Sequence, residues 1–95
     1  MDLNDFKEEA LKTDGNHDLA YYFLKLGSEA GEVQQNYAHY MKDKGIFRLL
    51  QDKVQDELGD MMWYWMILHS KLGLDPAITL DKNIAKLKAK YGSKK

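Results

Sequence analysis

The sequence contains no cysteine and only one proline among its 95 residues. The lack of cysteine excludes disulfide bonds, thiolate metal sites and cysteine nucleophiles. The scarcity of proline, together with few valine, isoleucine and threonine residues, favours helices over strands. A chain of this length has room for one hydrophobic core. We therefore predict a single all-α domain that covers residues 1–95.

The sequence also lacks an excess of either charge and a long hydrophobic run. Fourteen Lys and Arg residues stand against fifteen Asp and Glu residues, so the net charge is −1. A general nucleic-acid-binding protein needs a basic excess or stripe. The longest hydrophobic run, Met61–Leu68, falls well short of the roughly 18 residues of a membrane span, and the N-terminus has no signal-peptide pattern. We predict a cytoplasmic protein, in a bacterium or a phage-infected host cell, that binds neither a nucleic-acid polymer nor a membrane.

Hydrophobic residues recur in steps of three and four along four segments, which is the spacing of amphipathic helices. Turn signals separate the segments: a Thr13–Asn16 cluster, a Lys42–Gly45 cluster, and Gly73 followed by the helix-start pair Asp75–Pro76. The predicted helices run from about Leu3 to Lys12, Asp18 to Lys42, Phe47 to Lys71, and onward from Pro76 with an inner face of Ile78, Leu80, Ile84, Leu87 and Tyr91. Residues 92–95 are predicted to form a polar tail.

The run Met61–Leu68 is hydrophobic on every side of its helix. Such a helix has to be buried on more than one side, and four short helices offer little to surround it. We expect a second copy of the chain to cover the remaining side, in a homodimer or homotetramer. A methionine and aromatic box for a ligand is the alternative interpretation.

Two acidic pairs stand close to the hydrophobic stripes of the second and third helices. Glu29 lies about 20° from Tyr22 at a stripe edge, and Glu32 follows three residues later on the same face. Glu57 falls inside the stripe of the third helix, with Asp60 three residues later on its flank. A carboxylate directed at a core is costly unless it is paired or bound to a cation.

Acidic residues three apart are also common on solvated helix faces, and Glu8, Glu9, Asp43, Asp52 and Asp56 are interpreted as ordinary solvated charges. The position of Glu57 inside a hydrophobic face and its pairing with Asp60 favour a metal site instead. Oxygen ligands without cysteine or histidine suit Mg²⁺ or Mn²⁺.

Three stretches of the sequence resemble the MazG-like nucleoside triphosphate pyrophosphohydrolases. Leu26–Val33, with the sequence LGSEAGEV, is similar to the first acidic motif of that family, and Asp56–Tyr64, with the sequence DELGDMMWY, is similar to the second. Asn83–Tyr91 resembles the closing helix of the family. The resemblance covers roughly residues 17–92, and the two acidic motifs in this order make it fairly specific.

The resemblance implies an all-α, Mg²⁺-dependent enzyme that cleaves a nucleoside triphosphate between its α and β phosphates. It implies that Glu29, Glu32, Glu57 and Asp60 bind the metal and form the catalytic site. It further implies that the closing helix binds the substrate phosphates through Asn83, Lys86 and Lys90, with Tyr91 beside them. Candidates for the pocket of the base are Trp63, Trp65, Tyr22 and the residues around His17, although aromatic residues at helical spacing are more often core.

The sequence departs from the family pattern at two positions. Ser28 stands where the family has glutamate, which puts an accessory role there in doubt but leaves the metal-binding pair intact. Lys90 stands where the family has arginine, so the charge is kept and a two-pronged grip on phosphate is lost.

Other functions stay open at this point. A non-catalytic oligomeric bundle with a regulatory or interaction role explains Met61–Leu68 but not Glu57. A metal-binding sensor keeps the acids without turnover, and a di-iron site is disfavoured because no Glu-x-x-His is present. The richness in stacking residues favours a purine deoxynucleotide such as dGTP as substrate, in nucleotide-pool control or house-cleaning.

Overall fold

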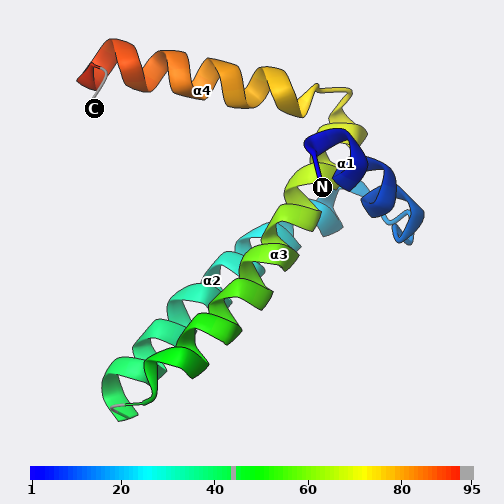
Figure 1. Ribbon diagram of the computed structural model, residues 1–95. Helices are drawn as coiled ribbons and strands as arrows, with labels where there is room; N and C mark the ends of the chain where they lie inside the picture. Colours follow the sequence, from blue (N-terminus) through cyan, green and yellow to red (C-terminus); the bar gives the residue numbers. More distant parts are fainter. Residues whose placement is uncertain (44, 93–95) are drawn as a thin grey trace.

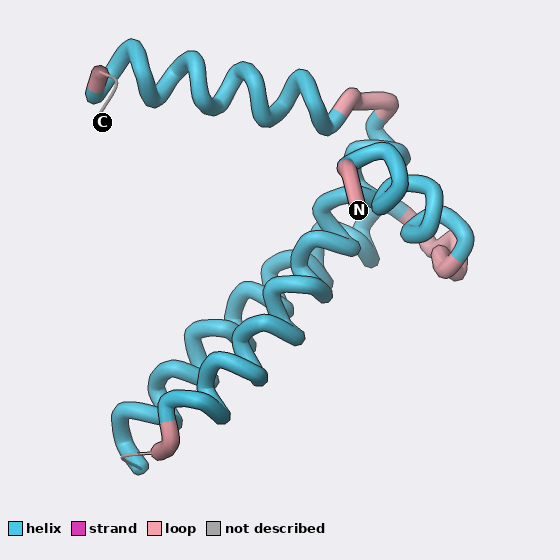
Figure 2. Tube along the Cα trace, in the orientation of Figure 1, coloured by secondary structure: helices cyan, strands magenta, loops and turns pink. Residues whose placement is uncertain are grey.

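The computed structural model describes residues 1–43 and 45–92, which form helices joined by short loops (Figure 2). These described residues contain four helices and no strand: α1 (Leu3–Lys12), α2 (Leu19–Asp43), α3 (Phe47–Leu72) and α4 (Pro76–Tyr91). The predicted all-α class is confirmed, and no predicted helix end is displaced by more than one residue. Lys44 of the predicted second turn and Ser93–Lys95 of the predicted tail lie outside the described residues.

The helix ends follow the capping signals in the sequence. The Asp2 carboxylate accepts a hydrogen bond from the Asp5 backbone at the start of α1, over 2.8 Å. At the start of α4 the Asp75 carboxylate accepts from the Ala77 backbone over 2.9 Å, and Pro76 occupies the first turn. Gly73 ends α3 in the left-handed conformation, with φ of 68°, which glycine adopts without strain.

Helices α2 and α3 lie side by side as a long antiparallel hairpin, and α1 lies across one end of it against α3 (Figure 1). The core is at that end. Tyr22, Met66 and Ile67 have no exposed surface, and Ala10 and Leu68 are buried beside them. Half-buried hydrophobic side chains pack around this cluster: Leu3, Phe6, Tyr21, Leu26, Trp63, Tyr64 and Trp65.

The hydrophobic run Met61–Leu68 is enclosed more fully by its own chain than the sequence suggested. Its last three residues, Met66 to Leu68, are buried because α1 folds over α3 at this point. Met62 remains 41% exposed. Met62 is thus the one residue of the run that stays exposed, and the other residues of its first half are half-buried.

A polar cluster ties the loop between α1 and α2 to the last turn of α3. The buried Tyr22 hydroxyl donates to the Asp14 carboxylate and accepts from the His17 backbone. Lys71 lies 3.4 Å from the Asp14 carboxylate and donates to the Asn16 side-chain oxygen over 2.6 Å. The loop is thus held in one conformation against the core end of the hairpin.

Helix α4 projects away from the hairpin and contacts the rest of the chain mainly at its first turn (Figure 1). There the buried ring of His69 bridges α3 and α4: Nδ1 lies 2.8 Å from the Trp65 carbonyl and Nε2 lies 2.7 Å from the Thr79 hydroxyl. The predicted inner face of α4 is therefore not covered by its own chain. All five of its residues are between 39% and 61% exposed: Ile78, Leu80, Ile84, Leu87 and Tyr91.

None of the helices in the described part of the chain has the length and hydrophobicity that a membrane crossing requires.

Candidate metal centre

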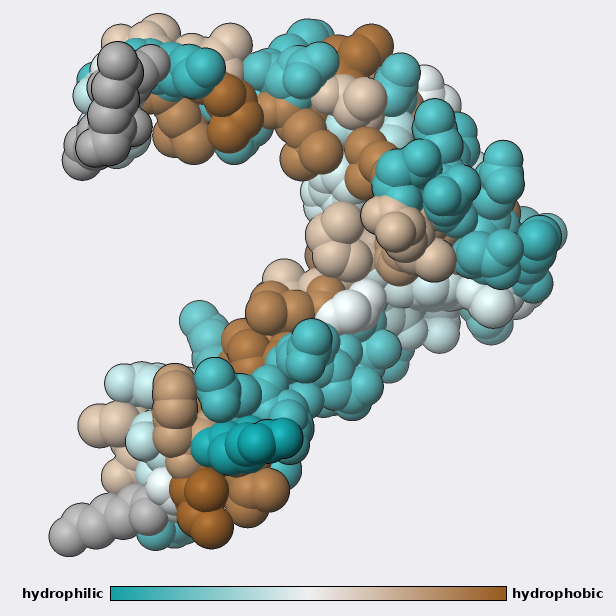
Figure 3. Space-filling model, in the orientation of Figure 1, coloured by the Kyte–Doolittle hydropathy of each residue, from teal (hydrophilic) through white to brown (hydrophobic). Residues whose placement is uncertain are grey.

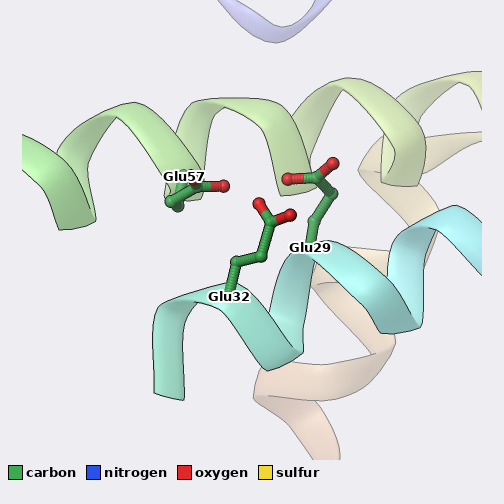
Figure 4. A group of neighbouring side chains, drawn as sticks. All are labelled: Glu29, Glu32 and Glu57. Atoms are coloured by element: carbon green, nitrogen blue, oxygen red, sulfur yellow. The ribbon is translucent and has the colours of Figure 1, made fainter. Parts of the chain in front are cut away.

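The hairpin brings three of the four predicted metal ligands into one cluster. Glu29 and Glu32 extend from adjacent turns of α2, and Glu57 extends toward them from α3 (Figure 4). One carboxylate oxygen of each lies within 4.8 Å of the others. The i and i+3 spacing on α2 places two acids on the face that meets α3, so the prediction that the acidic pairs converge is confirmed for these residues.

A second group shares Glu57 and extends along α3. The carboxylates of Asp56, Glu57 and Asp60 have oxygens within 4.8 Å of one another. Asp60, the fourth predicted ligand, therefore lies beside Glu57 and is not grouped with Glu29 and Glu32. Asp56 is exposed, as expected for a solvated charge, yet it borders the site. Sequence reasoning did not include Asp56 in the site, although its i and i+4 relation to Asp60 is a signal that could have placed it there.

The cluster is buried unevenly. Glu29 is only 8% exposed, Glu57 is half-buried, and Glu32 and Asp60 are exposed. The sequence placed Glu57 deeper than Glu29; the structure reverses this order because Glu29 lies nearer the core end of the hairpin. Oε2 of Glu29 and Oε2 of Glu57 are both buried without a hydrogen-bond partner among the described residues. Buried carboxylate oxygens are costly in that state, and a cation between them would remove the cost.

Hydrogen bonding between neighbouring carboxyl groups raises the pKa of Glu57, and burial raises that of Glu29. The nearby carboxylates of Glu32 and then Glu29, with burial adding to them, raise the pKa of Glu57 to about 7. Burial raises the pKa of Glu29, and Glu32 and Asp60 add to that rise, whereas contact with Glu57 opposes it. A site of this kind holds a proton near neutral pH until a cation replaces it.

We predict that the metal-free protein loses stability as the pH rises from about 4.5 to about 7. The ordinary pKa of a glutamate is 4.5, and the folded value for Glu57 is about 7. Between these values the folded state holds a proton that the unfolded state has released, so the free energy of unfolding falls as the pH increases. Urea titrations of the wild type across this range, in EDTA, measure the slope. Glu57→Gln should make the slope shallower, and an unchanged slope would contradict the raised pKa.

A hollow of about 370 Å³ opens beside the acidic cluster, lined by Thr13, Glu29, Asp60, Trp63 and Tyr64. The Trp63 indole nitrogen donates to the Thr13 hydroxyl over 2.7 Å, which fixes the orientation of the indole. The ring planes of Trp63 and Tyr64 meet edge to face, with centroids 4.9 Å apart. Two aromatic walls therefore stand next to two carboxylates of the site, and Thr13 is a lining residue that sequence reasoning missed.

His17, which was also predicted to lie near the pocket of the base, does not line the hollow. The ring of Tyr21 stands between His17 and Tyr64. The His17 ring stacks on Tyr21 with centroids 4.1 Å apart, and Tyr21 in turn lies 6.2 Å from Tyr64. His17 thus supports the aromatic wall behind the hollow, whereas Trp63 lines the hollow itself.

The predicted phosphate-binding residues lie on α4, which diverges from the hairpin after its first turn (Figure 1). Asn83 and Lys86, together with Lys82, line a separate hollow of about 720 Å³ at the turn between α3 and α4. Lys90 and Tyr91 lie at the far end of α4, with the Lys90 amine 5.1 Å above the Tyr91 ring. Within one chain, these four residues are not brought to the carboxylates.

Comparison with known proteins identifies one phage protein that is similar to this chain. "Gene 37 protein" of Mycobacterium phage L5 is 32% identical over 74 residues, which make up 76% of this chain and 65% of that protein. The chain thus corresponds to slightly less than two thirds of the relative's length. No family model matches the sequence, and no solved structure matches it. The resemblance to MazG-like enzymes accordingly rests on the sequence motifs alone.

Proposed function

We propose that this protein is a Mg²⁺-dependent nucleoside triphosphate pyrophosphohydrolase of the MazG-like type. The observation that carries the proposal is the convergence of Glu29, Glu32 and Glu57 between α2 and α3, with two buried carboxylate oxygens that have no partner among the described residues. Its substrate is a (d)NTP, which is converted to the nucleoside monophosphate and pyrophosphate.

The residues of the cluster fit a hard divalent cation. Two oxygens bound to one Mg²⁺ lie at most about 4.2 Å apart, and two bound to one Ca²⁺ at most about 5.2 Å. The oxygens of Glu29, Glu32 and Glu57 lie within 4.8 Å, so small side-chain rotations suffice to hold Mg²⁺ or Mn²⁺. Asp60 is placed to add an oxygen beside Glu57. When bound, such a cation supplies positive charge for phosphate oxygens and makes a bound water more acidic.

The hollow beside the cluster is the proposed place for the nucleoside. Trp63 and Tyr64 offer aromatic surfaces on which a base can stack, and the bond from Trp63 to Thr13 keeps the indole in place. Because Glu29 and Asp60 line the same hollow, a base held there has its phosphates next to the acidic cluster. A purine deoxynucleotide such as dGTP presents the larger stacking surface and is our proposed substrate.

The proposed setting follows from the substrate. A nucleotide pool is cytoplasmic, and similarity to a phage gene product is compatible with a role in a phage-infected bacterium. We propose a homodimer or homotetramer, because the hydrophobic face of α4 has no cover in its own chain.

That exposed face also favours a second candidate function, a non-catalytic oligomeric bundle that binds or regulates another protein. It accounts for the hydrophobic residues of α4 but gives no reason for buried, unpartnered carboxylate oxygens at Glu29 and Glu57. We therefore rank it below the enzyme.

One assay distinguishes the two functions. We expect the purified protein to release pyrophosphate from individual dNTPs and NTPs with Mg²⁺, and to release none with EDTA. Product analysis should show the monophosphate, since cleavage between the β and γ phosphates would give the diphosphate and inorganic phosphate. Absence of turnover with all eight common nucleotides, in Mg²⁺ and in Mn²⁺, would favour the non-catalytic bundle.

A further inference from the structure

The hollow beside the acidic cluster differs from the hydrophobic surfaces of the chain. Hydrophobic side chains gather on α4 and on the hairpin along the inner side of the bend between them (Figure 3). The hollow is lined instead by the rings of Trp63 and Tyr64 and by three polar residues, Thr13, Glu29 and Asp60. A concave site with flat hydrophobic walls and a few polar groups is typical of a place for a small molecule. The hydrogen bonds that each lining group already makes then decide which molecule fits.

The polar atom of the Trp63 ring is used within the protein. An indole has one hydrogen-bond donor and no acceptor. Its Nε1 donates to the Thr13 hydroxyl over 2.7 Å. The Thr13 hydroxyl in turn donates to the Ala10 carbonyl over 2.9 Å, and the Thr13 amide donates to the same carbonyl over 3.1 Å. The polar protons of this wall are therefore committed, and Trp63 offers the hollow a ring surface without a donor.

Thr13 is itself fixed from both sides, so the orientation of the indole is set before a ligand binds. On one side Thr13 caps the last turn of α1. On the other side Asp14 accepts a hydrogen bond from the buried Tyr22 hydroxyl and lies 3.4 Å from the Lys71 amine. A ring held in this way loses little freedom when a ligand stacks on it.

The other lining residues do not supply a free donor either. Burial, and then a hydrogen bond with Tyr21, raise the pKa of Tyr64 to about 12, so the phenol keeps its proton and has a partner for it in Tyr21. Glu29 and Asp60 are carboxylates, which accept hydrogen bonds and which the proposed function assigns to the cation. Among the described residues that line the hollow, no hydrogen-bond donor is therefore left for the edge of a base.

A site without free donors distinguishes bases poorly by their edges. Guanine carries an acceptor at position 6, whereas adenine carries a donor there. A site built to hydrogen-bond such a group rejects an analogue without it by about 10⁴-fold or more, whereas a hydrophobic pocket rejects one of the same shape by about 10²-fold at most. Stacking on an aromatic ring tolerates every base, because each has a π face, and it strengthens with the area in contact.

We propose that Thr13 and Trp63 make this site select a base by its stacking area and not by the hydrogen-bonding pattern of its edge. The substrate class is then the purine nucleoside triphosphates as a group, whatever substituents they carry at positions 2 and 6, with dGTP as one member. This inference rests on the proposed function and deepens it. Thr13 is a positioning residue, because it acts on the base through the indole that it fixes.

A set of purines with different edges tests the selection rule. We expect kcat/KM for dGTP, dATP, dITP and the deoxynucleoside triphosphate of unsubstituted purine to agree within about 10-fold in Mg²⁺, and the values for dCTP and dTTP to lie below all four. A larger spread among the purines, or a pyrimidine as good as the purines, would overturn the rule while leaving the enzymatic function in place.

Binding gives the same comparison without turnover. The probes are α,β-methylene-dGTP and α,β-methylene-dATP, which are not cleaved between the α and β phosphates, and calorimetry in Mg²⁺ measures their Kd. We expect the two Kd values to agree within about 10-fold. Agreement in a protein that cleaves no triphosphate would keep the selection rule and refute the enzymatic function. A larger difference would overturn the rule, and absence of binding would overturn both proposals.

Substitution of Thr13 tests whether it acts through the indole. Thr13→Val keeps the shape but loses the acceptor for Nε1, and we expect KM and the analogue Kd to rise about 3- to 10-fold for each purine, with kcat changed less than about 2-fold. Thr13→Ser keeps the hydroxyl and should retain the wild-type values. In Trp63→Phe, whose ring has no N–H group, adding Thr13→Val should change neither KM nor Kd further. An equal rise in both backgrounds would show that Thr13 acts on the fold alone, and would overturn its positioning role.

Discussion

Glu57→Gln is expected to lower turnover by at least about 100-fold, the loss that follows removal of a metal ligand or of its charge. Glutamine keeps the shape of the side chain but removes the negative charge that Glu57 contributes opposite Glu29 and Glu32. Steady-state pyrophosphate release with Mg²⁺ measures the effect. Because the substitution is isosteric, a fall in activity with normal helicity assigns the loss to the metal centre.

The same variant should separate stability from metal binding. In EDTA it should be as stable as the wild type or more stable, because a buried carboxylate oxygen without a partner is replaced by a neutral group. Added Mg²⁺ or Mn²⁺ should raise the Tm of the wild type by mass action on the folded state, and that of the variant much less. Glu8→Gln, on the exposed side of α1, is the matched control and should change neither quantity. Full activity and an unchanged metal-induced shift in Glu57→Gln would refute the site.

Ile67→Ala is expected to destabilise the fold by about 2–5 kcal/mol, which is the usual cost of removing a fully buried isoleucine. Ile67 has no exposed surface and lies in the cluster that joins α1, α2 and α3. Alanine at this position removes buried hydrophobic surface and leaves a cavity where the three helices meet. Urea unfolding monitored by helical circular dichroism gives the free energy directly.

The control for this variant is the same substitution at an exposed position. Ile46 precedes α3 and is 66% exposed, so Ile46→Ala should change the free energy of unfolding by no more than about 0.5 kcal/mol. Equal destabilisation by the two variants would mean that the core is not at the α1 end of the hairpin.

The core end of the hairpin also positions the candidate site. Tyr22 binds Asp14, and Lys71 binds both Asp14 and Asn16, so the loop that follows α1 is fixed on α3. This fixed loop begins with Thr13, whose hydroxyl receives the Trp63 indole proton. The aromatic wall of the hollow is therefore held by the hydrogen-bonded core end of the hairpin, and the buried Glu29 lines the same hollow.

The prediction of helices from the sequence was accurate because their causes are local. The three- and four-residue steps of hydrophobic side chains, the cap at Asp75 and the glycine at position 73 all act within a few residues. The acidic pairs were recognised for the same reason: carboxylates three residues apart on a helix share a face in any fold. Their convergence followed once two long helices were joined by a short turn.

Contacts between residues far apart in the sequence could not be predicted from local sequence patterns. The bond from Trp63 to Thr13 joins residues 50 positions apart, and that from Lys71 to Asn16 joins residues 55 apart. His69 carried no sequence signal, because its partner Thr79 lies in the next helix, beyond a turn whose direction is not encoded by periodicity. The order of burial was also misjudged: angular position on α3 placed Glu57 deepest, but distance from the core end decided in favour of Glu29.

The sequence by itself therefore determined the helices, their ends and the acidic faces of the hairpin, because backbone hydrogen bonding and side-chain periodicity are local properties. The tertiary structure alone decided that α1 encloses Met66 to Leu68 and that Glu29 is the buried carboxylate. It also decided that α4 leaves the hairpin with its hydrophobic face uncovered. Each of these depends on the direction in which a short turn sends the next helix. A few backbone dihedral angles set that direction, and packing between residues far apart in the chain selects among them.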